Sequence, residues 1–203
     1  MQITIRTEGD VYEPAADTEL LVRSLRLRQG ERILEIGTGT GLVAIHCAKH
    51  GGTVTATDVC AEALDLSREN ALLNKVDINL LEGDLFDPVD GTYDVIIFNP
   101  PYLPTNPEDL THSRLDKALD GGPDGTKVTV QFLKQLPEYL APDGRAYLVV
   151  SSLQDMKKID QEIHDQKLAA RKRDWERFDF ETITVLEIRR PPRETRPRGA
   201  GAV

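Results

Sequence analysis

The chain has 203 residues, 39% of them hydrophobic, and a formal net charge of -9 at pH 7. These values predict a single domain with a sizeable core, and the excess of acid argues against a broad electrostatic contact with nucleic acid. No apolar stretch approaches the roughly 18 residues that cross a membrane, and the first residues lack the apolar region of a signal peptide, so we expect a cytoplasmic protein with no membrane partner.

Short apolar runs alternate with longer amphipathic stretches, which is the pattern of an α/β sheet. We expect strands at 32–36, 54–57, 78–81, 93–98, 145–150 and 182–189. Helices are expected between them, at 15–25, 41–49, 61–74, 127–139 and 155–166. The segment 100–127 is rich in Pro and Gly and follows a strand, where open α/β sheets bind ligands, so it is predicted to be a lid or substrate wall. The Pro/Arg/Gly-rich tail 191–203 is expected to be disordered, which leaves 1–190 as the domain.

A glycine-rich loop follows the first strong strand and opens a helix, with the sequence Glu35-Ile36-Gly37-Thr38-Gly39-Thr40-Gly41. Glycines at such a place permit a tight turn and let a ligand approach the backbone amides closely. The dinucleotide fingerprint G-x-G-x-x-G does not fit, because position 42 is Leu and the third glycine comes one place early. The loop favours a nucleotide-type cofactor, and an ordinary strand-to-helix turn is the alternative.

Two acids follow the next two strands. Asp58 closes the second strand, about 20 residues beyond the first glycine, where a carboxylate can accept hydrogen bonds from both ribose hydroxyls. NAD-dependent enzymes place an acid there too, so Asp58 indicates an adenosine cofactor of either kind. Asp84 stands in Gly83-Asp84-Leu85 after the third strand; alone it could equally be a helix cap or turn residue.

The tetrapeptide Asn99-Pro100-Pro101-Tyr102 stands directly behind the apolar run 93–98. An amide, two prolines and an aromatic ring at a strand end predict a rigid slot for a flat polar group. Asn99 Oδ1 and the Pro100 carbonyl can accept the two hydrogens of a planar nitrogen, while Tyr102 packs on its flat face. Chemistry in such a slot depends on positioning and electrostatics rather than on a strong base. The alternative is a Pro-terminated strand followed by an ordinary turn.

The glycine loop resembles the first motif of the class I S-adenosylmethionine-dependent methyltransferases, and N-P-P-Y resembles the motif of those that modify an amino group of adenine or cytosine, or the amide of glutamine. The resemblance implies a Rossmann-like α/β fold, with a seven-stranded, mostly parallel sheet, an antiparallel last strand and helices on both faces. It also implies S-adenosylmethionine as cofactor and S-adenosylhomocysteine as product.

A narrower resemblance rests on three further segments, which are Asp10-Val11-Tyr12-Glu13-Pro14-Ala15-Ala16-Asp17-Thr18, Asn74-Lys75 and the stretch from Ala118 to Gly125. Over most of residues 10–190 the chain resembles the short eukaryotic and archaeal HemK-type enzymes, which methylate the GGQ glutamine of class-1 translation release factors. The resemblance implies a cofactor site made of Thr18, Glu35, Gly37, Thr38, Gly39, Gly41, Asp58, Val59, Asp84, Leu85 and Asn99. The catalytic residues that it implies are Asn99, Pro100, Pro101 and Tyr102.

The same resemblance implies a partner, a small zinc-binding activator protein that pairs with a sheet edge. In the usual strand order of this fold the strand within 76–81 is an edge, and its apolar sequence is a liability if left bare. We therefore expect this edge to bind the activator and the chain alone to be poorly soluble. A short edge strand covered by a loop is the alternative.

Histidines and cysteines do not suggest a metal site. Cys47 and Cys60 form no CxxC pair, which favours reduced thiols. His46 and His50 have the i, i+4 spacing of helical metal ligands, but the sequence offers no third ligand, so a solvated helix face is expected. His112 matches a histidine in the loops of HemK-type enzymes and is expected to shape the substrate wall.

Three other functions compete with glutamine methylation. The N-P-P-Y motif also serves N6-adenine methylation of DNA or RNA, although the negative charge makes nucleic acid an unlikely direct substrate. A protein lysine is another acceptor, but its ammonium must first lose a proton and no dedicated base is apparent. A scaffold without turnover is the non-enzymatic alternative, and the intact tetrapeptide and cofactor acids speak against it.

Overall fold

The computed structural model describes residues 2–7, 11–105, 108 and 119–191. The tail beyond Pro191 and part of the predicted substrate wall, including His112, lie outside the described residues. Seven strands form one sheet: β1 (Arg32–Ile36), β2 (Thr53–Asp58), β3 (Asn79–Glu82), β4 (Tyr93–Phe98), β5 (Leu140–Ser151), β6 (Ala169–Arg177) and β7 (Thr182–Arg189). The helices are α1 (Ala16–Ser24), α2 (Leu42–Lys49), α3 (Ala61–Leu73), α5 (Lys127–Tyr139) and α6 (Met156–Asp165).

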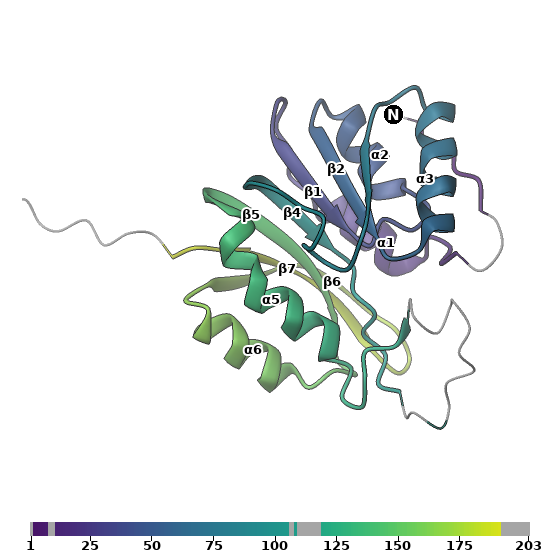
Figure 1. Cartoon of the computed structure of the whole chain (residues 1–203). Coiled ribbons are helices and arrows are strands. Elements are labelled where there is room, and N and C mark those ends of the chain that lie inside the picture. Colours follow the sequence, from purple (N-terminus) through teal and green to yellow (C-terminus); the bar gives the residue numbers. More distant parts are fainter. Residues whose placement is uncertain (1, 8–10, 106–107, 109–118, 192–203) are drawn as a thin grey trace, which may run out of the picture.

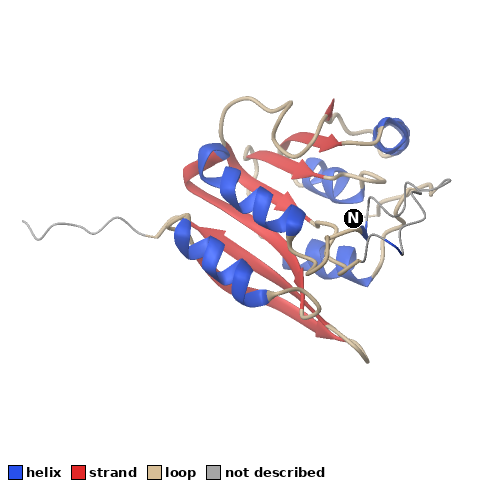
Figure 2. Ribbon diagram, turned by 60° about the horizontal axis from the view of Figure 1, so that its bottom comes forward, coloured by secondary structure: helices blue, strands red, loops and turns tan. Residues whose placement is uncertain are grey.

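The strand order in the sheet is β3-β2-β1-β4-β5-β7-β6. Neighbours from β3 to β5 pair in parallel, and β7 runs antiparallel to both of its neighbours, β5 and β6. Helices α5 and α6 lie side by side on one face of the sheet, while α1, α2 and α3 cover the other (Figures 1 and 2). The predicted fold class is confirmed. Within the described residues, no helix is long and apolar enough to cross a membrane.

The central position of β4 in the sheet explains why its sequence is an almost continuous apolar run. Ile96 and Phe98 pack into the core under α5 and α6, whereas Val95 and Ile97 pack into the core under α1 and α2. Alternate side chains of a strand point to opposite faces, so a strand covered on both sides is apolar at every position. This double burial fixes β4 and therefore fixes where Asn99 leaves the sheet.

The helices begin and end within one residue of their predicted bounds, but the strands depart from prediction in two places. β5 begins at Leu140, ahead of the predicted Arg145, and its pairing with β4 shifts register near the start. β6 was not located from the sequence at all, because its residues are mostly charged and exposed or half-buried. Main-chain pairing with β7 and the ion pairs from Arg23 to Asp174 and Glu176 hold it at the sheet edge. An apolar pattern cannot reveal such a strand.

Candidate functional site

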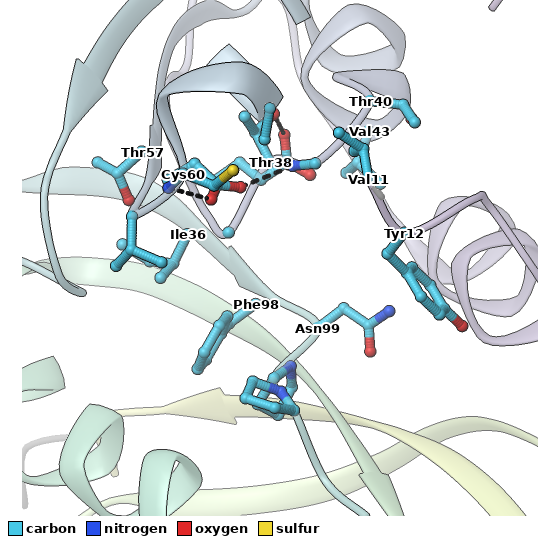
Figure 3. Close-up of a pocket in the computed structure, with 18 of the residues that line it drawn as sticks. Val11, Tyr12, Ile36, Thr38, Thr40, Val43, Thr57, Cys60, Phe98 and Asn99 are labelled. Carbon is cyan, nitrogen blue, oxygen red and sulfur yellow. Dashed lines mark hydrogen bonds between the residues drawn. The ribbon is translucent and has the colours of Figure 1, made fainter. Parts of the chain in front are cut away.

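A cavity of about 490 Å³ opens at the carboxyl ends of β1, β2 and β4 and extends to the loop after β3. Parallel strands end at the same edge of the sheet, which is where open α/β folds bind ligands. The predicted site residues that line it are Thr18, Glu35, Gly37, Thr38, Gly39, Asp58, Val59, Asp84, Leu85, Asn99, Pro100, Pro101 and Tyr102. Figure 3 shows Thr57 and Cys60 on one side of the cavity, with Tyr12 and Asn99 on the other.

Gly41 is the one predicted site residue that does not line the cavity. It caps α2 in the left-handed conformation, with a φ of 82°. A Cβ atom there would lie 2.4 Å from Ser67 Oγ, and Ser67 is fully buried on α3. Gly41 is therefore required for the turn and for the contact of the glycine loop with α3, rather than for contact with a ligand.

Hydrogen bonds from the strand-end loops hold the two acids at the ends of β1 and β2. Asp58 Oδ2 accepts a hydrogen bond from the Gly39 N–H at 2.9 Å, and Oδ1 accepts one from the Cys60 N–H at 3.0 Å. Burial raises the pKa of Asp58, and these hydrogen bonds oppose the shift. Glu35 accepts from Thr38 Oγ1 at 2.7 Å, and burial raises its pKa to about 8. Both carboxylates are thus fixed in place at the cavity wall.

The loop after β3 supplies the other end of the cavity. Asp84 is exposed, whereas Leu85 is buried and has a φ of 47°. Thr57 Oγ1, on β2, donates to the Leu85 carbonyl at 3.3 Å, which ties the loop to the sheet. The exposed carboxylate of Asp84 is therefore next to the Leu85 backbone, which the hydrogen bond from Thr57 fixes to the sheet.

Asp17 organises the opposite side of the cavity. Sequence analysis assigned it no role, although it lies in the N-terminal segment on which the resemblance rests. It is 2% exposed, and its carboxylate accepts hydrogen bonds from Tyr12 Oη at 3.1 Å, Tyr102 Oη at 3.2 Å and Asn99 Nδ2 at 2.9 Å. It also accepts the Thr18 N–H at 2.6 Å. Burial, followed by the charge of Asp17, raises the pKa of both tyrosines, so both hydroxyls remain donors.

Asn99 leaves one buried acceptor free. Because Nδ2 donates to Asp17, the amide has a fixed orientation, and Oδ1 is buried without a hydrogen-bond partner. A buried acceptor without a partner carries a desolvation cost that a ligand N–H can relieve. Asn99 and Tyr102 both line the cavity and both donate to Asp17 Oδ2, so this free acceptor belongs to the same part of the cavity wall as the Tyr102 side chain.

The hydrogen-bond acceptors of the cavity suit an adenosine cofactor, which carries ribose hydroxyls and an exocyclic amine. Carboxylates at the ends of successive strands can bind hydroxyls and amines, and a Cβ on Gly37 would lie 3.6 Å from the Phe98 ring, so the glycine leaves room along the wall. Among the described residues, no group of His, Cys, Asp and Glu side chains could hold a metal ion.

Comparison with known proteins agrees with this geometry. Residues 3–176 match the model of the methyltransferase small domain. The chain is 44% identical to a putative protein N5-glutamine methyltransferase of Methanocaldococcus jannaschii over 152 residues, which cover 74% of this chain and 77% of that protein. It is 35% identical to the release factor glutamine methyltransferase of Deinococcus radiodurans, of which it spans 56%.

The fold is also similar to that of a solved methyltransferase. In the E. cuniculi Mtq2-Trm112 complex, described as responsible for methylating the eRF1 translation termination factor, one chain superposes with a TM-score of 0.73 at 26% identity. The match covers 90% of this chain and 100% of that chain. The chain therefore belongs to the methyltransferase small domain family, among its protein N5-glutamine methyltransferases.

Proposed function

We propose that the protein transfers a methyl group from S-adenosylmethionine to the side-chain N5 of a glutamine, in the GGQ loop of a class-1 translation release factor. The names of the relatives support this substrate. The observation that carries the proposal is the buried, unpaired Oδ1 of Asn99, which is oriented by Asp17 and so can accept an N–H of the glutamine amide. Such a substrate implies a cytoplasmic location.

The cofactor would occupy the side of the cavity that carries the acids. Asp58 would accept the ribose hydroxyls, and Asp84 with the Leu85 N–H would address the adenine ring. Glu35 and the glycine loop would lie along the methionine part. When bound, S-adenosylmethionine supplies a methyl group made electrophilic by a positively charged sulfur.

The chain's own residues act on the acceptor amide. Its nitrogen is a poor nucleophile, because its lone pair is delocalised into the carbonyl. Asn99 Oδ1 and the Pro100 carbonyl can accept its two hydrogens and so orient the lone pair toward the methyl group. Since the N–H becomes acidic only as the nitrogen gains the methyl carbon, no strong base is required, and positioning is the main contribution.

Transfer of a labelled methyl group from S-adenosylmethionine tests which substrate the enzyme methylates. The enzyme, with its activator, is incubated separately with a release factor, with the same factor carrying GGA in place of GGQ, and with nucleic acid. We expect label on the GGQ factor alone. Label that persists on the GGA factor would point to another residue, such as lysine, and label on nucleic acid alone would contradict the proposal.

We also propose a small zinc-binding activator as partner at the exposed edge of β3. The structure places β3 at the end of the sheet, and Leu72 and Leu73, at the end of α3, are 73% and 43% exposed. A strand at the end of the sheet, paired on one side only and beside exposed leucines, suits strand addition together with apolar contact. The Mtq2-Trm112 complex supports a subunit of this kind.

Substitutions on β3 and α3 test the partner. Leu80→Lys and Leu72→Lys should abolish co-purification with the activator, and Leu72 offers the safer test because its side chain is mostly exposed. The matched control is Trp175→Lys on β6, a 55% exposed residue at the opposite edge. If the leucine variants still form the complex, the proposed edge is wrong.

A further inference from the structure

The first residues of the chain lie along α3, outside the sheet. We call residues 2–6 the strap. The Thr4 N–H donates to Asn74 Oδ1 at 3.0 Å, and Asn74 Nδ2 donates to the Thr4 carbonyl at 2.6 Å. The Arg6 N–H donates to Asn70 Oδ1 at 2.8 Å, and Asn70 Nδ2 donates to the Arg6 carbonyl at 3.0 Å. Each asparagine thus pairs with both polar groups of one backbone residue.

The spacing explains why two asparagines can do this. Positions i and i+4 on a helix are about 6 Å apart along its axis, and alternate residues of an extended chain are about 6.6 Å apart. Alternate residues also present their N–H and C=O on the same side. Asn70 and Asn74 therefore replace the edge of a neighbouring strand, and we refer to these two side chains as the amide pair.

Asn70 connects the strap to the glycine loop as well. Its Nδ2 makes a second hydrogen bond, to the Thr40 carbonyl at 2.9 Å, and Thr40 lines the cavity. Asn70 is fully buried, and its amide oxygen and both amide hydrogens are paired. One helical turn earlier, Ser67 meets Gly41 in the same loop. This part of α3 therefore supports the loop from behind.

Residues 11–14 contribute the outer wall of the cavity. Val11, Tyr12 and Pro14 line the cavity, and the Tyr12 carbonyl would lie 3.9 Å from a Cβ on Gly39. Tyr12 Oη is held by Asp17. The amide pair therefore holds the strap, Asp17 holds Tyr12, and the glycine loop lies against the Tyr12 backbone.

We propose that Asn70 and Asn74 are positioning residues for the cofactor, holding the outer wall and the glycine loop around it through the strap and the Thr40 carbonyl. This inference rests on the proposed use of S-adenosylmethionine. Neither asparagine lines the cavity, so their effect reaches the cofactor through backbone that they hold. Outside α3 itself, Asn74 holds only the strap, whereas Asn70 holds the strap and the loop, which predicts different effects for the two.

Binding of S-adenosylhomocysteine to the full chain, measured by calorimetry, tests this without any acceptor. We expect Asn74→Ala to raise the Kd about tenfold and Asn70→Leu about thirtyfold, because Asn74→Ala releases only the strap, whereas Asn70→Leu releases both the strap and the Thr40 carbonyl. The KM for S-adenosylmethionine should rise in parallel, while kcat at saturating cofactor stays within about twofold. The control Glu69→Gln removes only the exposed 3.9 Å contact with Arg6 and should leave the Kd unchanged.

Deleting residues 2–6 separates positioning from simple helix stability. The deletion should raise the Kd as Asn74→Ala does, and Asn74→Ala should have no further effect in the shortened chain. A Kd within twofold of wild type in Asn74→Ala or in the deletion would overturn the proposal, even if the Tm fell. Weakened binding together with no label on a release factor would leave this inference standing and refute the proposed substrate. A wild-type chain that does not bind S-adenosylhomocysteine would refute both.

Discussion

The two halves of the cavity are built in different ways. In the cofactor half, Asp58 is held by main-chain N–H groups of Gly39 and Cys60, and the partners lie in the strand-end loops themselves. In the acceptor half, Asn99 and Tyr102 are held by the side chain of Asp17, which belongs to the first helix. Backbone partners survive most substitutions, whereas the acceptor half depends on one carboxylate. The two halves should therefore fail differently when single residues are changed.

The largest effect is expected for Asn99→Ala, which removes the free acceptor. We expect kcat to fall about 1,000-fold, because an oriented polar group that acts in the transition state is lost. The Kd for S-adenosylhomocysteine should stay within about threefold of wild type. Single-turnover kinetics and calorimetry measure the two quantities. A fully active variant, or one that has lost cofactor binding instead, would show that the halves are not separable.

Asp58→Ala should give the reverse pattern. The variant lacks the carboxylate that would accept hydrogen bonds from both ribose hydroxyls, so cofactor binding should weaken about 100-fold. At saturating cofactor, kcat should approach the wild-type value, because the acceptor half is untouched. Initial rates over a range of S-adenosylmethionine concentrations measure this, and an unchanged KM would remove Asp58 from the cofactor half.

Asp17→Asn sharpens the comparison, since it changes the support of the acceptor half without removing an acceptor. Asn99 loses a charge-assisted hydrogen bond and becomes free to turn its NH₂ group toward the substrate. We expect kcat to fall about 30-fold with little change in cofactor Kd. The matched control, Tyr12→Phe, removes one donor to the same carboxylate and should cost less than about fivefold in kcat. Equal losses in the two variants would contradict the role given to Asp17.

The last effect concerns stability rather than activity, and is a pH dependence that comes from Glu35 in the cofactor half. Because burial raises its pKa in the folded state to about 8, the folded protein binds a proton more tightly than the unfolded chain does. That stabilisation is complete below the ordinary carboxyl pKa and is lost as the pH rises through about 8. Glu35→Gln mimics the neutral form, so between pH 5 and pH 9 it should gain about 4 kcal/mol of unfolding free energy relative to wild type. Urea unfolding at both pH values measures this; a constant difference would rule out the shift.

Most of the fold could be predicted because short segments of the sequence carry the hydrophobic patterns of the strands and helices that they form. The doubly buried β4 is an almost continuous apolar run, and the amphipathic segments predicted the helices to within one residue at each end. β6 could not be predicted, since its charged residues bury little and its place depends on β7 and on Arg23 of α1. Sequence analysis placed Gly41 in the cofactor site, because a sequence can show that a glycine is needed but not which neighbour requires it. The structure shows that the neighbour is Ser67, which leaves no room for a Cβ atom at position 41.

By itself, the sequence determined the chemistry available at each strand end: the glycine loop after β1, the acids after β2 and β3, and the tetrapeptide after β4. Each of these features follows its strand directly in the sequence, so the position of that strand in the sheet is enough to place it. The tertiary structure alone decided which of them are joined across the chain. Asp17 meets Asn99 from 82 residues away, and Asn74 meets Thr4 from 70 residues away. Such contacts arise from the order in which the sheet and its helices pack, and no spacing along the chain encodes them.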